Sequence, residues 1–90
     1  MVSMLQLITG SQIRMARAYL RWSIQHLADL SGIGTTTLKR MEAVDGLPEV
    51  SAVKTRLVQQ ILTKELDNRG LELTLGNGFG PGIRHREPME

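Results

Sequence analysis

The stretch LADLSGIGTTTLKRME, residues 27–42, passes from a helical pattern through a turn and into a second helical pattern. Ala28 lies four residues before Gly32, and Ile33 follows that glycine directly. A small residue at position 28 lets two helices cross closely, and a glycine at position 32 can take the positive φ that redirects the chain. The isoleucine can fill the space between the helices. The stretch therefore predicts a helix-turn-helix whose second helix begins near Thr35.

Signals on both sides of this stretch predict two more helices. Thr9 and Gln12 have the spacing of a capping box, so the first helix is expected over residues 10–21. Ser23 is an N-cap candidate for the helix that ends at Gly32. A fourth and longest helix is expected from residue 49 or 51 to about residue 68. Its broad apolar stripe consists of Val53, Leu57, Ile61, Leu62 and Leu66.

The hydrophobic period changes after the fourth helix. Residues 71–75, LELTL, alternate strictly between apolar and polar side chains, which is typical of a strand with one buried face. Residues 76–82, GNGFGPG, are predicted to form a glycine-rich turn, and residues 83–86 could form a short return strand. The sequence thus predicts a mainly α chain of four helices with a C-terminal β-strand or hairpin.

Composition restricts the possible functions. The chain has 90 residues, no cysteine and two histidines, so neither a disulfide framework nor a thiolate metal site is available, and we expect no metal or cofactor. No apolar run approaches the ~20 residues of a membrane span, and no signal peptide opens the chain, so a cytoplasmic protein without membrane contact is expected. No carboxylate pair or activated nucleophile stands out, and the glycine-rich turn lacks the Lys-Ser/Thr of a phosphate loop. We therefore do not expect an enzyme.

Basic residues are concentrated in the first half of the chain, although the net charge is only +2. From residue 11 to residue 42 there are five Arg and Lys residues against one Asp and one Glu. This excess permits a polyanionic partner. Because single-strand binders stack bases on aromatic platforms, the three aromatic residues of the chain argue against that class.

The N-terminal end of the expected third helix is the part that can enter a DNA major groove. Its short hydroxyl side chains can hydrogen-bond to base edges or phosphates, and a threonine methyl can pack on a thymine methyl. Lys39 and Arg40, one turn further on, can reach guanine or the DNA backbone. Thr37 precedes Leu38, so it is expected to face the preceding helix. The plain alternative is that these side chains only form a solvated surface.

Residues 13–42, IRMARAYLRWSIQHLADLSGIGTTTLKRME, resemble the Cro/C1-type helix-turn-helix family of phage repressors and small bacterial regulators, the XRE family. The resemblance extends loosely over residues 10–86 and implies a lambda-repressor-like four-helix domain that binds double-stranded DNA. It implies an N-terminal extension at 1–9, a DNA-binding domain at 10–69 and a dimerisation segment with tail at 70–90. The residues that carry the resemblance are Arg17, Trp22, Ser23, Leu27, Ala28, Gly32 and Glu42.

The resemblance also implies roles for individual residues. An ion pair between Arg17 and Glu42 would tie the first helix to the end of the third. Positions facing the bases would be Thr35, Thr36, Lys39 and Arg40. Candidates for phosphate contacts are Arg14, Arg21, Ser23, Gln25 and Thr37. Two positions depart from the family pattern: Ile24 stands where a phosphate-contacting glutamine is common, and Gly34 replaces the usual Ser or Thr cap.

Two functions stay open at this stage. The first is a sequence-specific transcriptional regulator, a repressor, that inserts its third helix into the major groove as a homodimer. The second is a helix-turn-helix module that binds another protein, as an antitoxin-like or antiactivator partner, with weak or no DNA binding. The apolar Ile24 favours the second function.

A homodimer is expected through the segment after Gly70. Leu71, Leu73 and Leu75 project from one face of a strand, and an isolated hairpin is marginal in water. Pairing with the same strand of a second chain would bury these leucines and close the strand edge. It would also place two recognition helices about one DNA turn apart. In the alternative, the leucines fold back on the fourth helix of their own chain and the protein is monomeric off DNA.

Overall fold

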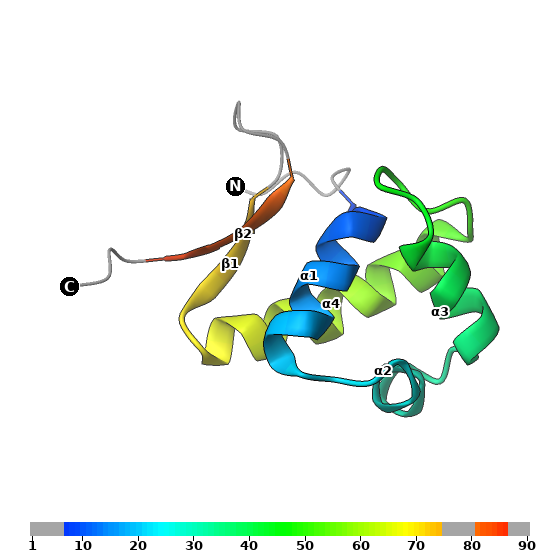
Figure 1. Cartoon of the computed structure of the whole chain (residues 1–90), viewed down its shortest axis with the longest axis horizontal. Helices are drawn as coiled ribbons and strands as arrows, with labels where there is room; N and C mark the ends of the chain where they lie inside the picture. Colours follow the sequence, from blue (N-terminus) through cyan, green and yellow to red (C-terminus); the bar gives the residue numbers. More distant parts are fainter. Residues whose placement is uncertain (1–6, 75–80, 87–90) are drawn as a thin grey trace.

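The computed structural model describes residues 7–74 and 81–86, and these form four helices and a two-stranded sheet. In chain order the elements are α1 (Gly10–Leu20), α2 (Ile24–Ser31), α3 (Thr35–Glu42), α4 (Ala52–Asn68), β1 (Leu71–Thr74) and β2 (Gly82–His85). Figure 1 shows α1 in front of α4, with the hairpin at one end of the molecule and α3 at the other. The expected mainly α chain with a C-terminal hairpin is confirmed.

Side-chain caps explain where the helices begin. The Thr9 hydroxyl accepts the N–H of Gln12 at 3.2 Å, and the Gln12 side-chain oxygen accepts the N–H of Thr9 at 3.0 Å. This reciprocal pair is the predicted capping box. Ser23 caps α2 by accepting the N–H of His26 at 3.0 Å. α3 begins after Gly34, which has no side chain to cap it.

Two residues in the left-handed region shape the turns around α2. Gly32 ends α2 with φ of 73°, as the helix-turn-helix prediction requires. Arg21 ends α1 with φ of 57°, which is uncommon for a residue with a side chain. The first helix therefore stops at Leu20, one residue earlier than expected, because Arg21 already turns the chain toward α2.

The core lies where α1, α2, α3 and α4 meet, and Ile33 from the turn is buried within it. The buried apolar residues are Ile8, Ile13, Ala16, Leu20, Leu27, Ala28, Ile33, Leu38, Met41, Val58, Leu62, Leu66 and Leu71. The stripe predicted for α4 was partly wrong: Leu62 and Leu66 are buried, but Val53 is 80% exposed and Leu57 39%. The helix is rotated so that Thr55 and Val58, rather than Val53 and Leu57, face the core.

The hairpin pairs β1 with β2 in antiparallel register, with Leu73 opposite Ile83. The second strand begins at Gly82, one residue earlier than expected. The buried side chain of Gln12 holds the hairpin on α1, because its amide donates to the carbonyl oxygens of Thr74 at 2.8 Å and Gly82 at 3.1 Å. Gln12 therefore serves both the helix cap and the sheet.

The leucines of the expected dimer strand differ in their surroundings. Leu71 is only 4% exposed and belongs to the core of its own chain. Leu73 is half-buried and packs against the same core, while Leu75 lies outside the described residues. Leu71 is thus buried by its own chain. This residue does not need a second chain to cover it.

Gly10 lets α1 approach the loop that follows α3. A Cβ atom at this position would overlap the carbonyl oxygens of Val44 and Met41. The Gly10 N–H also donates to the carbonyl oxygen of Gly46 at 2.8 Å, which fastens the start of α1 to this loop. Only glycine fits at this contact.

We therefore expect Gly10→Ala to lower the free energy of unfolding by about 1–3 kcal/mol, because overpacked sites force the backbone apart. Urea denaturation measures the loss. The matched control is Gly46→Ala, since a Cβ at Gly46 meets no other atom within 4 Å. Equal free energies of unfolding for the Gly10 and Gly46 variants would show that the close approach of α1 to this loop does not affect stability.

Candidate nucleic-acid interface

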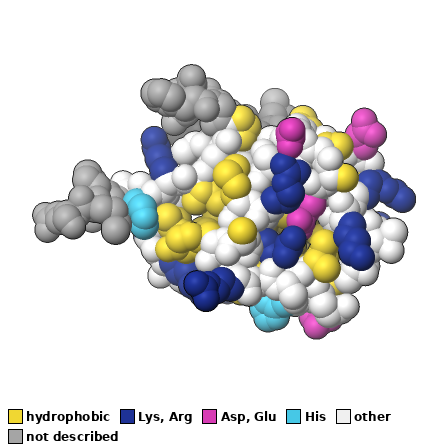
Figure 2. All heavy atoms as spheres, viewed as in Figure 1, with side chains coloured by type: hydrophobic (Ala, Val, Ile, Leu, Met, Phe, Trp, Pro, Cys, Tyr) yellow, Lys and Arg dark blue, Asp and Glu magenta, His cyan; other side chains and the backbone are white. Residues whose placement is uncertain are grey.

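α3 has one buried side and one exposed side. Leu38 and Met41 are fully buried against the rest of the domain. Thr36, Lys39 and Arg40 are exposed, and Thr35, at the first turn, is half-buried. Three of the four predicted base-contact residues thus lie on the solvent side of one helix. Figure 2 shows basic side chains, interspersed with Asp and Glu, on the side of the molecule where α1 and α3 lie.

A salt bridge between Arg17 and Glu42 sets the position of α3. The Arg17 Nε donates to Glu42 Oε2 at 2.8 Å, and Nη2 donates to Oε1 at 2.9 Å. The remaining Nη1 donates to the carbonyl oxygen of Trp22 at 3.0 Å. One guanidinium therefore joins α1, the turn before α2 and the last residue of α3. This is the ion pair that the family resemblance implied.

The environment of Arg17 keeps it charged. Its hydrogen bond to Glu42 raises the pKa of the guanidinium above its usual value, against the opposing effect of burial. A raised pKa means that the stabilisation is fully present below the ordinary arginine pKa and is lost only at extreme alkaline pH. The arginine therefore gives α3 a fixed anchor throughout the physiological range.

The described residues contain five ion pairs, and none of them uses a cation of α3. They are Arg14–Asp45, Arg17–Glu42, Arg69–Glu65, Arg84–Glu72 and Arg86–Asp67. Within residues 7–74 and 81–86, Lys39 and Arg40 have no acidic partner, and neither has Arg21 at the end of α1. The positive charge of α3 is therefore uncompensated, and an anionic ligand would not have to displace an internal carboxylate.

Arg14 was predicted to contact phosphate, but its guanidinium reaches from α1 to the end of α3 and the loop that follows. Its guanidinium donates to the carbonyl oxygens of Glu42 and Val44 and pairs with the carboxylate of Asp45 at 2.6 Å. Because these contacts cross from α1 to residues about thirty positions later, no local pattern could have revealed them. Arg14 therefore closes the loop, and its charge is already partly neutralised.

Three of the other four predicted phosphate contacts, Arg21, Ser23 and Gln25, lie around the start of α2. Arg21 and Ser23 are exposed, although the Ser23 hydroxyl already caps the helix. The Gln25 amide donates to Asp29 at 2.9 Å on the exposed side of α2. Thr37, in α3, is half-buried. Of these residues, Arg21 is the one with a free charge.

Ile24 occupies the position where the resembling family often has glutamine. The side chain is half-buried and packs against the core. It therefore offers little apolar surface to a partner protein. The residue extends the core at the start of α2.

Comparisons of the chain with models of protein families, with curated proteins and with solved structures gave no match. The family resemblance therefore stays a prediction that rests on the residues themselves. Among the helices of the described residues, none is both long and apolar enough to cross a bilayer. The same residues contain no group of three or more His, Asp or Glu side chains arranged to bind a metal ion.

We expect Arg17→Ala to destabilise the domain, because the nearly buried Glu42 carboxylate would lose both of its charged hydrogen bonds. Breaking a buried pair costs about 3–5 kcal/mol, and the partial exposure of Arg17 places this site near the lower limit. The control is Arg84→Ala, which breaks the exposed pair with Glu72 and is expected to cost less than about 1 kcal/mol. Similar melting temperatures for the two variants would contradict the anchoring role of Arg17.

Proposed function

We propose that the protein is a cytoplasmic, sequence-specific regulator that binds double-stranded DNA and acts as a repressor. The observation that supports the proposal is the arrangement of α3. Its inner side is held by the core and by the Arg17–Glu42 pair, while its outer side carries Thr36, Lys39 and Arg40. A rigid helix with free hydrogen-bond donors along one side has the form that a major groove admits.

The outer residues of α3 match the chemistry of base edges. The Arg40 guanidinium can donate two parallel hydrogen bonds to O6 and N7 of guanine, a pattern found on no other base pair in the major groove. The hydroxyl groups of Thr35 and Thr36 can donate to or accept from bases, and their methyl groups can contact thymine. The Lys39 ammonium can reach guanine or a phosphate. These side chains would provide the sequence readout.

Contacts to the DNA backbone would come from the residues around the start of α2. The Arg21 side chain has no internal ion pair in the described residues, so it can neutralise a phosphate. Ser23 and the first N–H groups of α2 lie at a helix N-terminus, which favours anions. Gln25 could contact a phosphate only after releasing Asp29. Such contacts hold the domain on the duplex without reading its sequence.

The competing proposal, a module that binds another protein, rested on Ile24. Because Ile24 is half-buried and packs against the core, only part of its side chain is left to serve that function at the start of α2. The free cations of α3 favour an anionic partner instead. We therefore place DNA binding ahead of protein binding.

Arg40→Ala should weaken binding to a preferred duplex by about 1–3 kcal/mol and relax the preference at one base pair. The duplex can be enriched from a random-sequence library and the affinity measured by fluorescence anisotropy. Arg84→Ala removes the same charge from the hairpin and should leave the affinity and the preference unchanged. An enriched duplex that binds the Arg40 variant as tightly as the wild type would contradict the assignment of α3.

Arg21→Ala should act differently, because a phosphate contact carries no sequence information. We expect weaker binding to all duplexes by a similar factor and a salt dependence whose slope falls by about 1. Titrations of the enriched duplex and of a scrambled duplex, each at several salt concentrations, measure both effects. A variant that loses affinity for the enriched duplex alone would make Arg21 a base-reading residue.

A further inference from the structure

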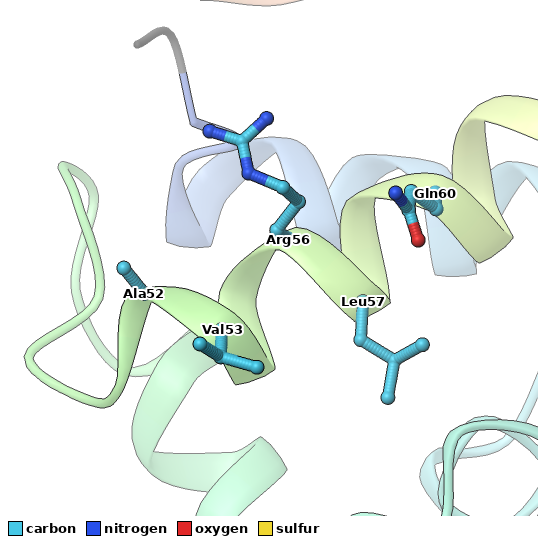
Figure 3. A pocket seen from close by; sticks show the side chains of 5 residues that line it. All are labelled: Ala52, Val53, Arg56, Leu57 and Gln60. Atoms are coloured by element: carbon cyan, nitrogen blue, oxygen red, sulfur yellow. The ribbon is translucent and has the colours of Figure 1, made fainter. Parts of the chain in front are cut away.

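The outward side of α4 carries apolar side chains that the core does not use. Val53 and Leu57 are one helical turn apart and are 80% and 39% exposed. Figure 3 shows both side chains pointing to the same side of α4, while Arg56 points to the other side. We call Val53 and Leu57 the α4 ridge. An open hollow of about 390 Å³ on this helix is lined by Ala52, Val53, Arg56, Leu57 and Gln60.

The charges around the α4 ridge are positive. Residues 50–64 contain Lys54, Arg56 and Lys64 but no Asp or Glu. Helical spacing places Lys64 on the line of the ridge and the other two cations on its two flanks. Lys54 lies in the first turn of α4, where the helix dipole disfavours a cation, and that turn holds no acidic residue. Helix stability therefore does not account for this placement, whereas an anionic partner would.

The carboxylates of α4 do not offset this positive charge. The helix has two acidic residues, Glu65 and Asp67, and each is paired with an arginine outside the helix. Lys54 and Lys64 are exposed and form no ion pair within the part of the chain that the structure describes. The nearest acidic residue before the helix is Glu49, in the preceding loop. Both lysines are therefore available to carboxylates of a partner.

We propose that the α4 ridge binds an acidic amphipathic helix of another protein. Apolar side chains of that helix pack on Val53 and Leu57, whose i,i+4 spacing forms the kind of ridge that helix packing uses. Its carboxylates pair with Lys54 and Lys64, which are ten residues apart and hence about 15 Å apart along the axis of α4. The contact uses no side chain of α3, so it goes beyond the proposed function and does not depend on it.

Two other anionic partners fit the α4 ridge less well. A DNA backbone would use the lysines, but phosphate contacts come from charged and polar groups and give Val53 and Leu57 no role. A helix that lies in an anionic bilayer needs a large apolar face. The described residues of α4 expose only these two large apolar side chains. An acidic protein segment is the partner that uses both the apolar and the positive groups.

A synthetic fluorescein-labelled peptide tests the proposal: an amphipathic helix with leucines at i and i+4 and glutamates beside them. Fluorescence anisotropy measures its binding to the protein in the absence of DNA. Leu57→Glu should weaken binding by at least about tenfold, because it removes a central apolar contact and adds a like charge. Met15→Glu is the matched control, because Met15 has the same 39% exposure but lies on α1. No binding by the wild type at high micromolar concentration, or equal weakening by both variants, would overturn the proposal.

Charge reversal adds a second test that does not depend on apolar packing. The double variant Lys54→Glu with Lys64→Glu should bind the acidic peptide at least about tenfold more weakly. A peptide with lysines in place of the glutamates should bind this double variant but not the wild type, because the opposite charges meet again. Lys39→Glu, on α3, should bind the acidic peptide as the wild type does, and its failure to do so would contradict the assignment to α4. Circular dichroism of each variant shows whether it is folded.

Titrations with phosphatidylglycerol vesicles and with a random-sequence duplex separate protein recognition from general binding of anions. Leu57→Glu should bind the duplex as the wild type does, since the α4 ridge lies outside the proposed DNA contacts. Binding to vesicles or to the duplex that requires Leu57, without binding of the acidic peptide, would overturn the proposal in favour of a membrane or a nucleic acid. A wild type that binds the peptide through α4 but binds no duplex would refute the proposed function alone. A wild type that binds an enriched duplex but not the peptide would refute the α4 contact alone.

Discussion

The salt bridge between Arg17 and Glu42 is the contact on which the orientation of α3 relative to α1 and α2 depends. A planar guanidinium can satisfy both oxygens of a carboxylate and still donate to a third acceptor, which here is the carbonyl oxygen of Trp22. Because these groups come from α1, the turn before α2 and the end of α3, the three segments are held in one geometry. The outer side of α3 is presented to solvent as a consequence.

The arginines of the first half divide into two groups by their partners. Arg14 and Arg17 reach from α1 to the end of α3 and the loop after it, so their charges stabilise the fold. Arg40 and Arg21 have no carboxylate partner among the residues that the structure describes, so their charges remain available to a ligand. The sequence shows only a modest basic excess in this half of the chain. The structure adds that the positive charge without a carboxylate partner is concentrated at Arg21 and Arg40, while Arg14 and Arg17 are already paired.

Local signals predicted most of the fold, and long-range contacts account for what was missed. The capping box at Thr9 and the turn glycine at Gly32 act within a few residues, so their patterns are visible in the sequence. The rotation of α4 could not be predicted, because Leu57 and Val58 are both apolar and only packing decides which is buried. The bonds from Gln12 to the hairpin join residues more than sixty positions apart. The Arg17–Glu42 pair came from the family resemblance, and the structure contains it. The candidate base contacts came from the chemistry of the third helix and from the resemblance, and of these Thr36, Lys39 and Arg40 are exposed.

Backbone amide chemical shifts, recorded while an enriched duplex is titrated into the protein, test the central claim most directly. If α3 enters the major groove, the largest changes will fall on residues 35–40 and on the start of α2, with Arg21 beside them. The amides of β1 and β2 will change little, since the hairpin lies at the opposite end of the molecule (Figure 1). Large changes confined to the hairpin or to the outward side of α4, with α3 unaffected, would contradict the account.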